Sequence, residues 1–483
     1  MSADADEPPR EAGKLPTGRL ARTARVGGLV SGQGLRWAGM RTANRVRTPE
    51  RAAQAQSERT AALVGQLVDR LGQMRGAAMK VGQMISMVEL DGLDEPEREA
   101  LQSKLAELRD DVPPVPFARL ERLMRQEVGG PLSSVFSAFD ERAFAAASIG
   151  QVHRATTVDG DEVVVKVQYP GVAEAVETDL RNAMMLLPLI KRLAPGLDGR
   201  ALATELRERI TEELDYELEA QHQRRIERLL RGHPFMVVPR VHTELCTRRM
   251  LVSAYLDGDR FEEVRAGDPA RRDRYGEIVF RFFFGLLYRE RIALGDPHPG
   301  NYLLCPDGRV GFLDFGLMRD IDPARRDAES AIARAVREGD AAALKAALVA
   351  GGYLPPERAD GVHADLALRL MRRATRWYAV PGERRLGTGQ PGSGDGRHRD
   401  RLADEQREQI REQMSHFTLP ADTALIRRMH GIVAIVLSQL RAGADWGAIA
   451  AEYLYGEPPA TALGEAEADF LRHRIGQSSS SVR

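Results

Sequence analysis

The order of strand-like and helix-like segments predicts a two-lobed α+β fold, with a helical extension before it and a helical C-terminal region after it. Three observations carry this prediction. An amphipathic helical pattern covers residues 58–88, strand-like segments recur between residues 163 and 313, and the chain after them has a mainly helical pattern. The length agrees, because 483 residues are enough for one large two-lobed fold with extensions.

The segment before the predicted lobes carries two helical patterns. Residues 58–88 repeat apolar side chains every three or four positions, and residues 94–108 follow an N-cap signal at Asp94. We therefore expect residues 51–112 to form a helical extension. Residues 1–50 are rich in Pro, Gly, Ala and Arg, and we expect them to be a disordered or loosely docked tail.

The rest of the chain divides where the pattern changes. Residues 113–258 are expected to form the N-lobe, because they hold the first strand-like run and a long helical pattern at about 199–230. Residues 259–330 are expected to form the catalytic core of the C-lobe, and residues 331–483 the helical C-terminal region. A Gly-rich polar stretch at residues 387–396 predicts a flexible loop.

The overall composition argues against several classes of protein. A formal net charge of −1 does not favour nucleic-acid binding. Two cysteines are too few for a disulfide framework and are typical of a reduced cytoplasmic setting. No run approaches the roughly 20 apolar residues that span a bilayer. The Arg-rich tail either stays solvated or touches anionic lipid, so peripheral contact with the inner face of the cell membrane is the alternative to a purely cytoplasmic protein.

The strongest functional signal is a pair of motifs around a predicted hairpin. Residues 295–301 read Gly-Asp-Pro-His-Pro-Gly-Asn, and residues 310–316 read Val-Gly-Phe-Leu-Asp-Phe-Gly. Asp296 and Asn301 have the spacing of the catalytic Asp and metal-binding Asn of kinases, and Asp314 opens an Asp-Phe-Gly triplet. Phosphoryl transfer needs a carboxylate at the acceptor and oxygen ligands for Mg²⁺. Together the motifs predict an ATP site, with a polar turn between two strands as the plain alternative.

A lysine stands within a strand-like run of valines. Residues 163–167 read Val-Val-Val-Lys-Val after a turn signal at residues 159–161. A buried strand rarely carries Lys without a partner. In kinases such a Lys binds the α- and β-phosphates and pairs with a Glu on the following long helix. Glu219 is the candidate partner for Lys166, and the alternative is an edge-strand lysine that faces water.

An alanine-rich segment precedes the lysine strand, at the place where kinases have a Gly-rich loop. Residues 145–153 read Ala-Ala-Ala-Ser-Ile-Gly-Gln-Val-His. Such a loop can offer backbone N–H groups to phosphate, although it leaves less room than glycine for a close approach. Taken alone, the three alanines also fit the start of a helix. The candidate nucleotide-binding residues here are Ala145, Ala146, Ala147, Ser148, Ile149, Gly150 and Gln151, together with Lys166.

Two further strand-like segments cover residues 235–241 and 250–255. Residues 255–258, Tyr-Leu-Asp-Gly, follow the second of them and are expected to form the hinge between the lobes. We expect backbone groups of Tyr255 and Leu256 to bind adenine. A buried helix is expected over residues 274–291, and the Ser-rich end at residues 477–483 is expected to be disordered.

Taken together, these motifs resemble the UbiB/AarF family of atypical kinases. The alanine-rich segment looks like that family's nucleotide loop. Residues 79–83, Met-Lys-Val-Gly-Gln, match its Lys-x-Gly-Gln motif, and residues 213–216, Glu-Leu-Asp-Tyr, match its Glu-x-Asp motif. The resemblance covers about residues 60–318 in the family's order and spacing. It implies a protein-kinase-like form of the two-lobed α+β fold.

The resemblance assigns roles residue by residue. Lys166 and Glu219 resemble the ion pair that grips the nucleotide. Asn301 and Asp314 resemble the Mg²⁺ ligands, and Asp296 resembles the catalytic-loop Asp. The family usually has His-Ala before this Asp, whereas the present chain has Leu-Gly at residues 294–295, which bears on how Asp296 is oriented.

A second set of residues resembles the family's own additions to the kinase fold. Lys80 and Gln83 resemble a motif that lies across the active site, where a protein substrate would sit. Glu213 and Asp215 resemble its acidic partners. On an ideal helix Asp215 and Glu219 project together with Glu212, whereas Glu213 does not, so Glu212 is the alternative to Glu213.

The resemblance implies an Mg²⁺/ATP-dependent kinase or ATPase with a link to isoprenoid-quinone (ubiquinone) metabolism. The expected ligands are ATP or ADP with Mg²⁺, and a small or lipid-like molecule that is either substrate or regulator. Three alternatives stay open: a nucleotide-binding regulator without turnover, an ordinary protein kinase, and an aminoglycoside-type phosphotransferase. The sequence decides neither the phosphoryl acceptor nor the oligomeric state.

Overall fold

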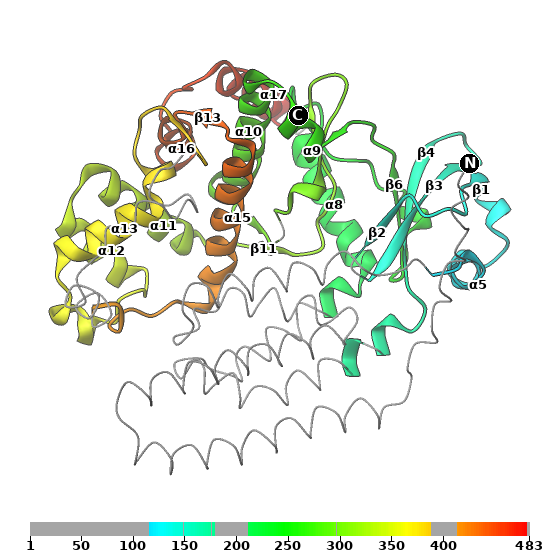
Figure 1. Ribbon diagram of the computed structural model, residues 1–483, viewed down its shortest axis with the longest axis horizontal. Helices are drawn as coiled ribbons and strands as arrows, with labels where there is room; N and C mark the ends of the chain where they lie inside the picture. The colour runs from blue at the N-terminus through cyan, green and yellow to red at the C-terminus, as the bar shows by residue number, and fades with distance from the viewer. Residues whose placement is uncertain are drawn as a thin grey trace, which may run out of the picture. The chain divides into compact units, whose positions relative to one another are not determined.

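The computed structural model describes residues 115–147, 149–174, 176–178, 211–295, 297–387 and 413–480. The chain divides into two compact units, which are described separately below (Figure 1). Unit 1 comprises Met1–Leu218 and His242–Ser253, and unit 2 comprises Glu219–Val241 and Ala254–Arg483. The helices expected within residues 51–112, and residues 388–396 of the expected flexible loop, lie outside the described residues and stay predictions.

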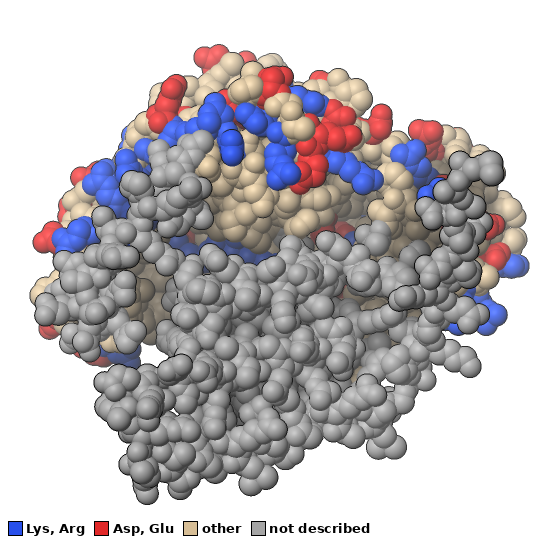
Figure 2. Space-filling model, viewed as in Figure 1, with Lys and Arg blue, Asp and Glu red and all other residues tan. Residues whose placement is uncertain are grey.

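The visible surface carries both signs of charge. Basic and acidic side chains lie next to one another over the described residues in Figure 2, in keeping with the formal net charge of −1. No helix of the described residues has the length and apolar character needed to cross a membrane. Residues 431–440, an apolar run about half as long as a bilayer span, lie within α15, Ala424–Leu440.

Unit 1 is built on a sheet with the strand order β1-β3-β4-β6, to which β2 adds by pairing with β3. The elements are helix α5 (Phe117–Val128), the 3₁₀ turns Leu132–Ser134 and Thr243–Leu245, and strands β1 (Phe136–Phe139), β2 (Ala145–Ala147), β3 (Gly150–Thr157), β4 (Glu162–Gln168) and β6 (Met250–Ala254). The lysine strand is thus confirmed as β4. It follows the predicted turn, in which Gly160 has a φ of 89° that favours glycine.

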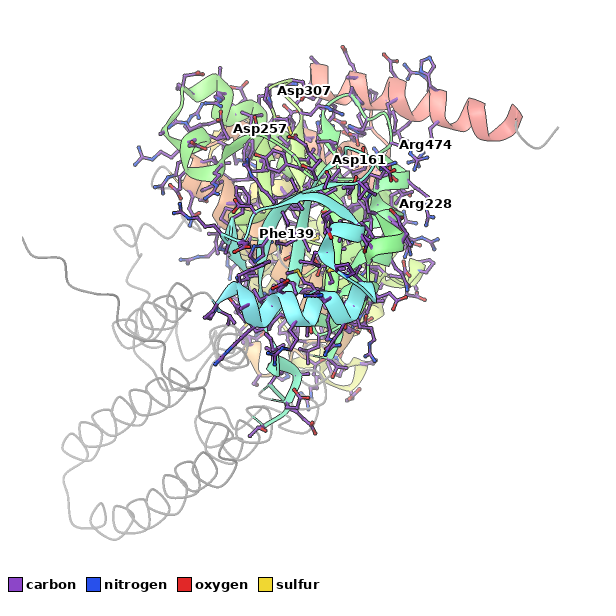
Figure 3. All side chains as sticks on the ribbon, turned by 90° about the vertical axis from the view of Figure 1, so that its right-hand side faces the viewer. Phe139, Asp161, Arg228, Asp257, Asp307 and Arg474 are labelled. Atoms are coloured by element: carbon purple, nitrogen blue, oxygen red, sulfur yellow. The ribbon has the colours of Figure 1, made fainter. Side chains whose placement is uncertain are left out.

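One face of this sheet is covered by α5. Val163, Val165 and Val167 alternate along β4 and are all buried, as the two-residue period of a strand requires. They pack in one hydrophobic cluster with Leu120 and Met124 of α5. Figure 3 shows α5 lying across the strands. The apolar faces of helix and sheet therefore close the small core of unit 1.

Unit 2 combines a four-stranded sheet, order β5-β10-β9-β7, with many helices. Its strands are β5 (Met236–Val237), β7 (Asp259–Arg260), β8 (Ile292–Leu294), β9 (Tyr302–Leu304), β10 (Val310–Phe312), β11 (Met318–Asp320), β12 (Arg384–Arg385) and β13 (Gly443–Ala444). Its helices, the first of which begins in unit 1, are α8 (Tyr216–Leu230), α9 (Phe261–Ala266), α10 (Pro269–Phe284), α11 (Pro323–Glu338), α12 (Ala341–Ala350), α13 (Ala364–Ala379), α15 (Ala424–Leu440), α16 (Trp446–Tyr455) and α17 (Ala462–Ser480). Short turns are Pro299–Asn301, Pro356–Gly361 and Ala421–Thr423, and a π-helix covers Gly285–Arg289.

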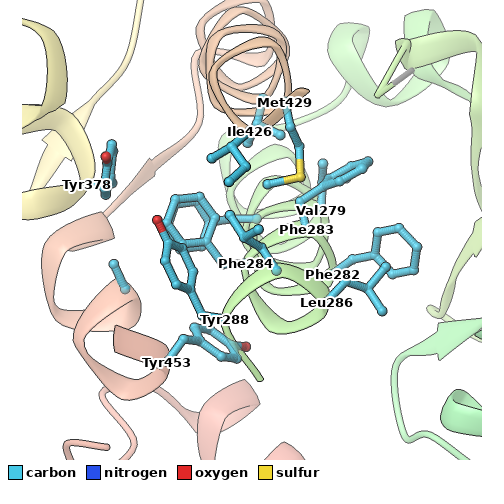
Figure 4. Packing of buried hydrophobic residues seen from close by; sticks show 14 of the residues in the cluster. Val279, Phe282, Phe283, Phe284, Leu286, Tyr288, Tyr378, Ile426, Met429 and Tyr453 are labelled. Atoms are coloured by element: carbon cyan, nitrogen blue, oxygen red, sulfur yellow. The ribbon is translucent and has the colours of Figure 1, made fainter. Parts of the chain in front are cut away.

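An aromatic core holds unit 2 together. Figure 4 shows Phe283 and Phe284 of α10 beside Ile426 and Met429 of α15. Phe282 stacks on Phe312 of β10 with the ring centroids 3.5 Å apart. The strand that leads to Asp314 therefore packs directly on α10, whose second half is almost entirely buried.

Several expected boundaries differ from the structure. The long helix expected over residues 199–230 is interrupted, because Leu214 and Asp215 are not helical and α8 begins at Tyr216. The strand expected over residues 235–241 shrinks to β5, since Pro239 has no N–H for a sheet ladder.

Three other expectations also shift. The buried helix begins earlier than expected, at Pro269 after the N-cap Asp268, and gives way to the π-helix at Gly285. At the C-terminus, α17 continues to Ser480, within the stretch expected to be disordered. The expected N-lobe, residues 113–258, also differs from unit 1, because Ile226 of α8 and Phe235 are buried in the core of unit 2.

Candidate active site

One antiparallel hairpin of unit 2 carries the two expected magnesium ligands. Strands β9 and β10 pair so that Tyr302 lies opposite Phe312. One residue beyond the strands, the Leu313 N–H donates to the Asn301 carbonyl at 3.0 Å. Asn301 and Asp314 therefore lie at the same end of the hairpin, and backbone hydrogen bonds hold them there.

The Asp-Phe-Gly segment is supported by α8. Asp314 Oδ1 accepts a hydrogen bond from the Gly316 N–H at 2.9 Å. His222 Nδ1 donates to the Phe315 carbonyl at 3.0 Å. Glu219, 4% exposed, places its carboxylate 3.9 Å from the position that a Cβ on Gly316 would take. Glu219 and His222 are three residues apart and so share one face of α8, which contacts this segment.

The two ligands fit a magnesium ion that is shared with a nucleotide. Mg²⁺ prefers oxygen ligands, and in phosphate-transfer sites it is bound by one or two carboxylates together with substrate phosphates. In the part of the chain that the structure describes, no group of three or more His, Cys, Asp or Glu side chains is placed to hold a metal ion. One amide oxygen from Asn301 and the Asp314 carboxylate would therefore need phosphate oxygens to complete the ligand set.

Asp296 lies outside the described residues, but its chain neighbour is placed. Leu294 is buried in β8 and pairs with Met318 of β11. The Gly295 N–H donates to the Leu317 carbonyl at 2.9 Å. A Cβ on Gly295 would overlap the side chain of Leu317. This chain has Leu-Gly at residues 294–295, where the family usually has His-Ala. The side chain of Leu317 fills the space that a side chain at position 295 would need.

His298 has a local structural role within the same loop. Its Nδ1 accepts a hydrogen bond from the Gly300 N–H at 3.0 Å, and its carbonyl accepts from the Asn301 N–H at 3.0 Å. The imidazole thus helps to form the short turn that presents Asn301.

The expected hinge residues belong to unit 2. Leu256 lies over β10, because a Cβ on Gly311 would come within 2.9 Å of Leu256 Cδ1. The Tyr255 hydroxyl donates to Asp257 Oδ1 at 3.3 Å. Leu256 therefore lies against β10, the strand that precedes Asp314, and the hinge role and adenine binding of Tyr255 and Leu256 stay predictions.

In unit 1 the alanine-rich segment forms a strand and a tight hairpin. Ala147 pairs with Gly150 and Ala146 with Gln151, so the structure excludes a helix start at these alanines. A Cβ on Gly150 would overlap the Val167 carbonyl oxygen and come within 3.0 Å of the Tyr216 hydroxyl. Close packing against β4 therefore requires glycine at this position. Ser148 lies outside the described residues. The next residue, Ile149, is buried.

Lys166 is half-buried in β4, where it pairs with Val152 of β3. Its Nζ lies 4.8 Å from the centroid of the Tyr216 ring. A cation over an aromatic face gains about 0.5–2 kcal/mol, depending on its exposure to water. Tyr216 therefore holds the lysine charge close to the hairpin, since it also contacts Gly150.

The side chain of Gln151 points into unit 1. It is 2% exposed and bonds to Val115 and His153. Any contact between Gln151 and a nucleotide would therefore involve its backbone.

Asp215 caps α8, and this corrects the expectation that it projects from one helix with Glu219. Its Oδ1 accepts hydrogen bonds from the N–H groups of Glu217 and Leu218, both at 3.1 Å. Its Oδ2 accepts from Arg248 Nε at 3.1 Å. Because the helix is interrupted here, an ideal helix cannot decide between Glu212 and Glu213. The roles of Glu213 and Asp215 toward Lys80 stay predictions, since Lys80 and Gln83 lie outside the described residues.

The expected residues thus fall into two groups. Unit 2 brings together Glu219, Asn301 and Asp314, and unit 1 brings the alanine hairpin to Lys166. The ion pair of Lys166 with Glu219 would join the two units, so it stays a prediction.

A separate cavity in unit 2 lies beneath α17. Its lining includes His233, Arg281, Arg289, Glu467 and Arg474, and its free volume is about 20 Å³. That is room for roughly one water molecule. Burial lowers the pKa of His233 to about 4, and its Nδ1 accepts the Met236 N–H at 3.2 Å. This cavity is too small to be a nucleotide site.

Sequence reasoning missed three residues that support these groups: His222, Tyr216 and Arg248. His222 follows Glu219 by one helical turn, so helical periodicity was a usable signal. Tyr216 lies within the segment compared with the Glu-x-Asp motif. Arg248 offered no signal, because it is 33 residues away from Asp215 along the chain.

Comparisons with known proteins agree with this geometry. The model of the ABC1 atypical kinase-like domain matches residues 107–348. The chain is 31% identical over 331 residues to "Atypical kinase COQ8B, mitochondrial" of Rattus norvegicus, which is 68% of this chain and 62% of that protein. It is 34% identical over 225 residues to "Protein ACTIVITY OF BC1 COMPLEX KINASE 1, chloroplastic" of Arabidopsis thaliana, which is 45% of this chain and 33% of that protein.

A solved structure also resembles this chain. It is the complex of Rv3197 with erythromycin from Mycobacterium tuberculosis, with a TM-score of 0.57 and 30% sequence identity over 83% of this chain and 98% of that one. These likenesses confirm the predicted kinase-like α+β fold. The chain spans about 60% of the length of the rat relative and of a Saccharomyces cerevisiae relative, "Atypical kinase COQ8, mitochondrial".

Proposed function

The chain belongs to the ABC1 atypical kinase-like family, which is the UbiB family, and on that premise we propose that it is an Mg-ATP-dependent kinase or ATPase. The observation that carries the proposal is the hairpin of β9 and β10. It holds Asn301 and Asp314 at one end, and α8 places the buried Glu219 carboxylate beside Gly316. An oxygen ligand pair next to a buried acid fits phosphoryl transfer, which depends on positioning and charge stabilisation.

Each residue has a defined task in this proposal. Lys166 would bind the α- and β-phosphates, and Glu219 would hold the lysine in position. Asn301 and Asp314 would hold Mg²⁺, which when bound neutralises charge on the phosphate oxygens. Asp296 would orient the attacking hydroxyl or water. Gly150 would let the alanine hairpin lie close to β4 while its backbone N–H groups face the phosphates.

The acceptor in this proposal is water or a small or lipid-like molecule. Lys80 and Gln83 support this choice through the family resemblance, because that motif lies where a protein substrate would sit. A related protein is described in complex with erythromycin, so a large apolar molecule belongs among the candidate ligands. The names of relatives that are mitochondrial or chloroplastic atypical kinases motivate an assay with isoprenoid-quinone precursors and membrane lipids.

The first experiment compares thermal stability with and without Mg-ATP or Mg-ADP. A ligand that binds only the folded state raises the unfolding free energy by about 2.7 kcal/mol at a hundredfold excess over its dissociation constant. We expect a metal-dependent rise in the wild type that is lost in Asp314→Asn. The matched control is Asp307→Asn, which removes a carboxylate from the turn of the same hairpin, where it bonds to Arg309. Loss of the shift in both variants, or its absence from the wild type, would refute the proposed site.

A second measurement separates an enzyme from a nucleotide-binding regulator. The regulator is favoured by one observation, the replacement of His-Ala by Leu294 and Gly295 before Asp296. Phosphate release from ATP would be measured with phospholipid, detergent, quinone-precursor and macrolide additives. Turnover that disappears in Asp314→Asn supports the enzyme. Binding without turnover under every condition supports the regulator, and phosphate on Ser, Thr or Tyr supports a protein kinase.

A further inference from the structure

Gln151 is a buried glutamine that follows the alanine-rich hairpin. Its Oε1 accepts a hydrogen bond from the Val115 N–H at 3.1 Å, and its Nε2 donates to the Val115 carbonyl at 3.4 Å. The same Nε2 lies 3.1 Å from His153 Nε2. Val115 is 36 residues away along the chain, and it immediately precedes the N-cap of α5. The side chain of Gln151 thus joins β3 to the start of α5.

The tautomer of His153 follows from its partners. His153 Nδ1 lies 2.9 Å from the Asp140 carbonyl, which can only accept, so Nδ1 must carry the proton. Nε2 of the neutral ring is then an acceptor for the second Gln151 N–H. Both amide hydrogens of Gln151 are used, and both ring nitrogens of His153 have partners. This is a completely satisfied buried network, which specifies one arrangement of its members.

The surroundings of His153 keep the ring neutral. The side chain is 0% exposed and packs against the rings of Phe117 and Phe139. Burial lowers the pKa of His153, against the opposing effects of the Asp140 carbonyl and charge. Asp140 is the only ionisable group among the described residues that acts on it. A second ring proton at Nε2 would meet the Gln151 amide hydrogens and break the network.

Helix α5 is also held near its C-terminal end by side-chain hydrogen bonds. Glu127 Oε1 accepts a hydrogen bond from Arg249 Nε at 2.8 Å, and Glu127 also bonds to Thr247. The middle of the helix packs on the sheet through Leu120 and Met124. Among the described residues, the hydrogen bonds that connect the start of α5 to the hairpin strand are those of Gln151, and the Phe117 ring adds a contact with His153. The pairing of Gln151 with Ala146 makes it part of that hairpin.

We propose that Gln151 is a positioning residue, which fixes the alanine-rich hairpin against the start of α5. The inference rests on the proposed nucleotide site. It adds a link that the motif by itself does not reveal, because Val115 is 36 residues away from Gln151 along the chain. A shift of the start of α5 is transmitted to the hairpin through the hydrogen bonds of the Gln151 carboxamide, supported by the contact of Phe117 with His153.

The test begins with Gln151→Met, which keeps the volume and removes every hydrogen bond. The affinity for Mg-ATP is expected to fall roughly tenfold to a hundredfold, because a small misplacement of a binding loop has effects of this size. Hydrogen exchange of the Val115 amide should become faster. The matched control is Gln223→Met, since Gln223 is 1% exposed and donates to the Pro239 carbonyl in unit 2 at 2.8 Å. The control should lose stability without losing nucleotide affinity relative to the wild type.

Gln151→Glu provides a readout that a general loss of packing would not change. A carboxylate accepts from the Val115 N–H but cannot donate to neutral His153, so the variant should bind Mg-ATP weakly at pH 8. When His153 is protonated, its Nε2–H donates to the carboxylate and the link is restored. The affinity of Gln151→Glu should therefore rise as the pH falls from 8 to 6, while that of the wild type does not rise.

The outcomes separate this inference from the proposed function. If the wild type does not bind Mg-ATP, the proposed function fails and the inference with it. If folded Gln151→Met binds Mg-ATP as the wild type does, although its Val115 amide exchanges faster, only the positioning role is overturned. The same holds if Gln151→Glu shows no recovery of affinity at lower pH.

Discussion

The two units hold their candidate residues by different physical means. In unit 2, Asn301 and Asp314 lie at the end of a hairpin whose strand β10 stacks on α10 through Phe312 and Phe282. In unit 1, the alanine hairpin depends on a side-chain network around Gln151 and His153. A backbone ladder itself contains no titratable group, whereas a network with one neutral imidazole loses its arrangement when the ring is protonated. The expected magnesium ligands are therefore held by backbone pairing and ring packing, and the alanine-rich hairpin by side-chain hydrogen bonds.

The buried charges follow the same contrast. Unit 2 encloses Arg281, 0% exposed, which bonds to Glu277, Glu452 and Glu467 and connects α10 to α16 and α17. The described part of unit 1 has no arginine buried to this degree. Unit 2 thus contains a buried ionic network in which every charged group needs its partners.

The largest effect is expected for Arg281→Met in unit 2. The substitution leaves Glu452 and Glu467 buried without their shared cation, and breaking such a network costs about 3–5 kcal/mol. Urea denaturation should show this loss of unfolding free energy. Arg281→Lys should recover part of it, because it keeps the charge but not the two-pronged geometry toward Glu452. A loss below about 1 kcal/mol for Arg281→Met would show that unit 2 does not depend on this network.

A smaller effect is expected for the pH dependence of unit 2. Burial, followed by the charge of Arg427, lowers the pKa of His430 to about 3, below its ordinary value of 6.5. The unfolded chain therefore binds the proton first, and stability falls as the pH drops from 6.5 toward 3. From pH 7.5 to pH 5 this one group removes about 2 kcal/mol of unfolding free energy.

His430→Phe isolates that contribution. The new ring stays among Phe284 and Tyr378, and the lost bond to the Tyr288 hydroxyl costs about 1 kcal/mol at every pH. Urea midpoints at pH 7.5, 6 and 5 should fall less steeply in the variant than in the wild type. If the urea midpoint falls equally steeply with pH in both proteins, the protonation of His430 does not contribute to the loss of stability between pH 7.5 and pH 5.

The smallest effects are expected for a matched pair of glycines. Gly150→Ala in unit 1 would press a methyl group onto the Val167 carbonyl, and overpacking of this kind costs about 1–3 kcal/mol. A Cβ on Gly431, in α15 of unit 2, would meet open space. Gly431→Ala should therefore raise the free energy of unfolding by up to about 1 kcal/mol. Thermal unfolding of both variants gives the comparison. Equal effects of the same sign would contradict the close approach of the hairpin to β4.

Local pattern was sufficient to predict the elements that carry the expected metal ligands. The sequence predicted a hairpin between Asn301 and Asp314, and the structure has its two strands at Tyr302–Leu304 and Val310–Phe312. The run of valines around Lys166 predicted β4, because alternate side chains of a strand face the core. These features depend on residues within one element or one turn, so the sequence pattern contains them.

Long-range contacts decided what the pattern could not. Helical periodicity predicted one continuous helix over residues 199–230, but Asp215 ends it by capping α8 and pairing with Arg248. The start of α5 depends on Gln151, a residue that the motif alone assigned to the nucleotide. Asp215 thus combines a local helix cap with a distant partner, and Gln151 bonds to a residue 36 positions away along the chain.

The sequence by itself determined the two-lobed α+β fold class, the hairpin and the strand of Lys166, because these follow from periodicity, turn chemistry and fixed spacing. The resemblance of its motifs to a known family added the kinase-like form. Only the tertiary structure decided that Leu317 fills the space beside Gly295, that His222 supports the Asp-Phe-Gly segment, and that Gln151 faces Val115. The physical reason is distance along the chain: packing and buried hydrogen bonds join residues that no local pattern relates, and they exist only once the core has formed.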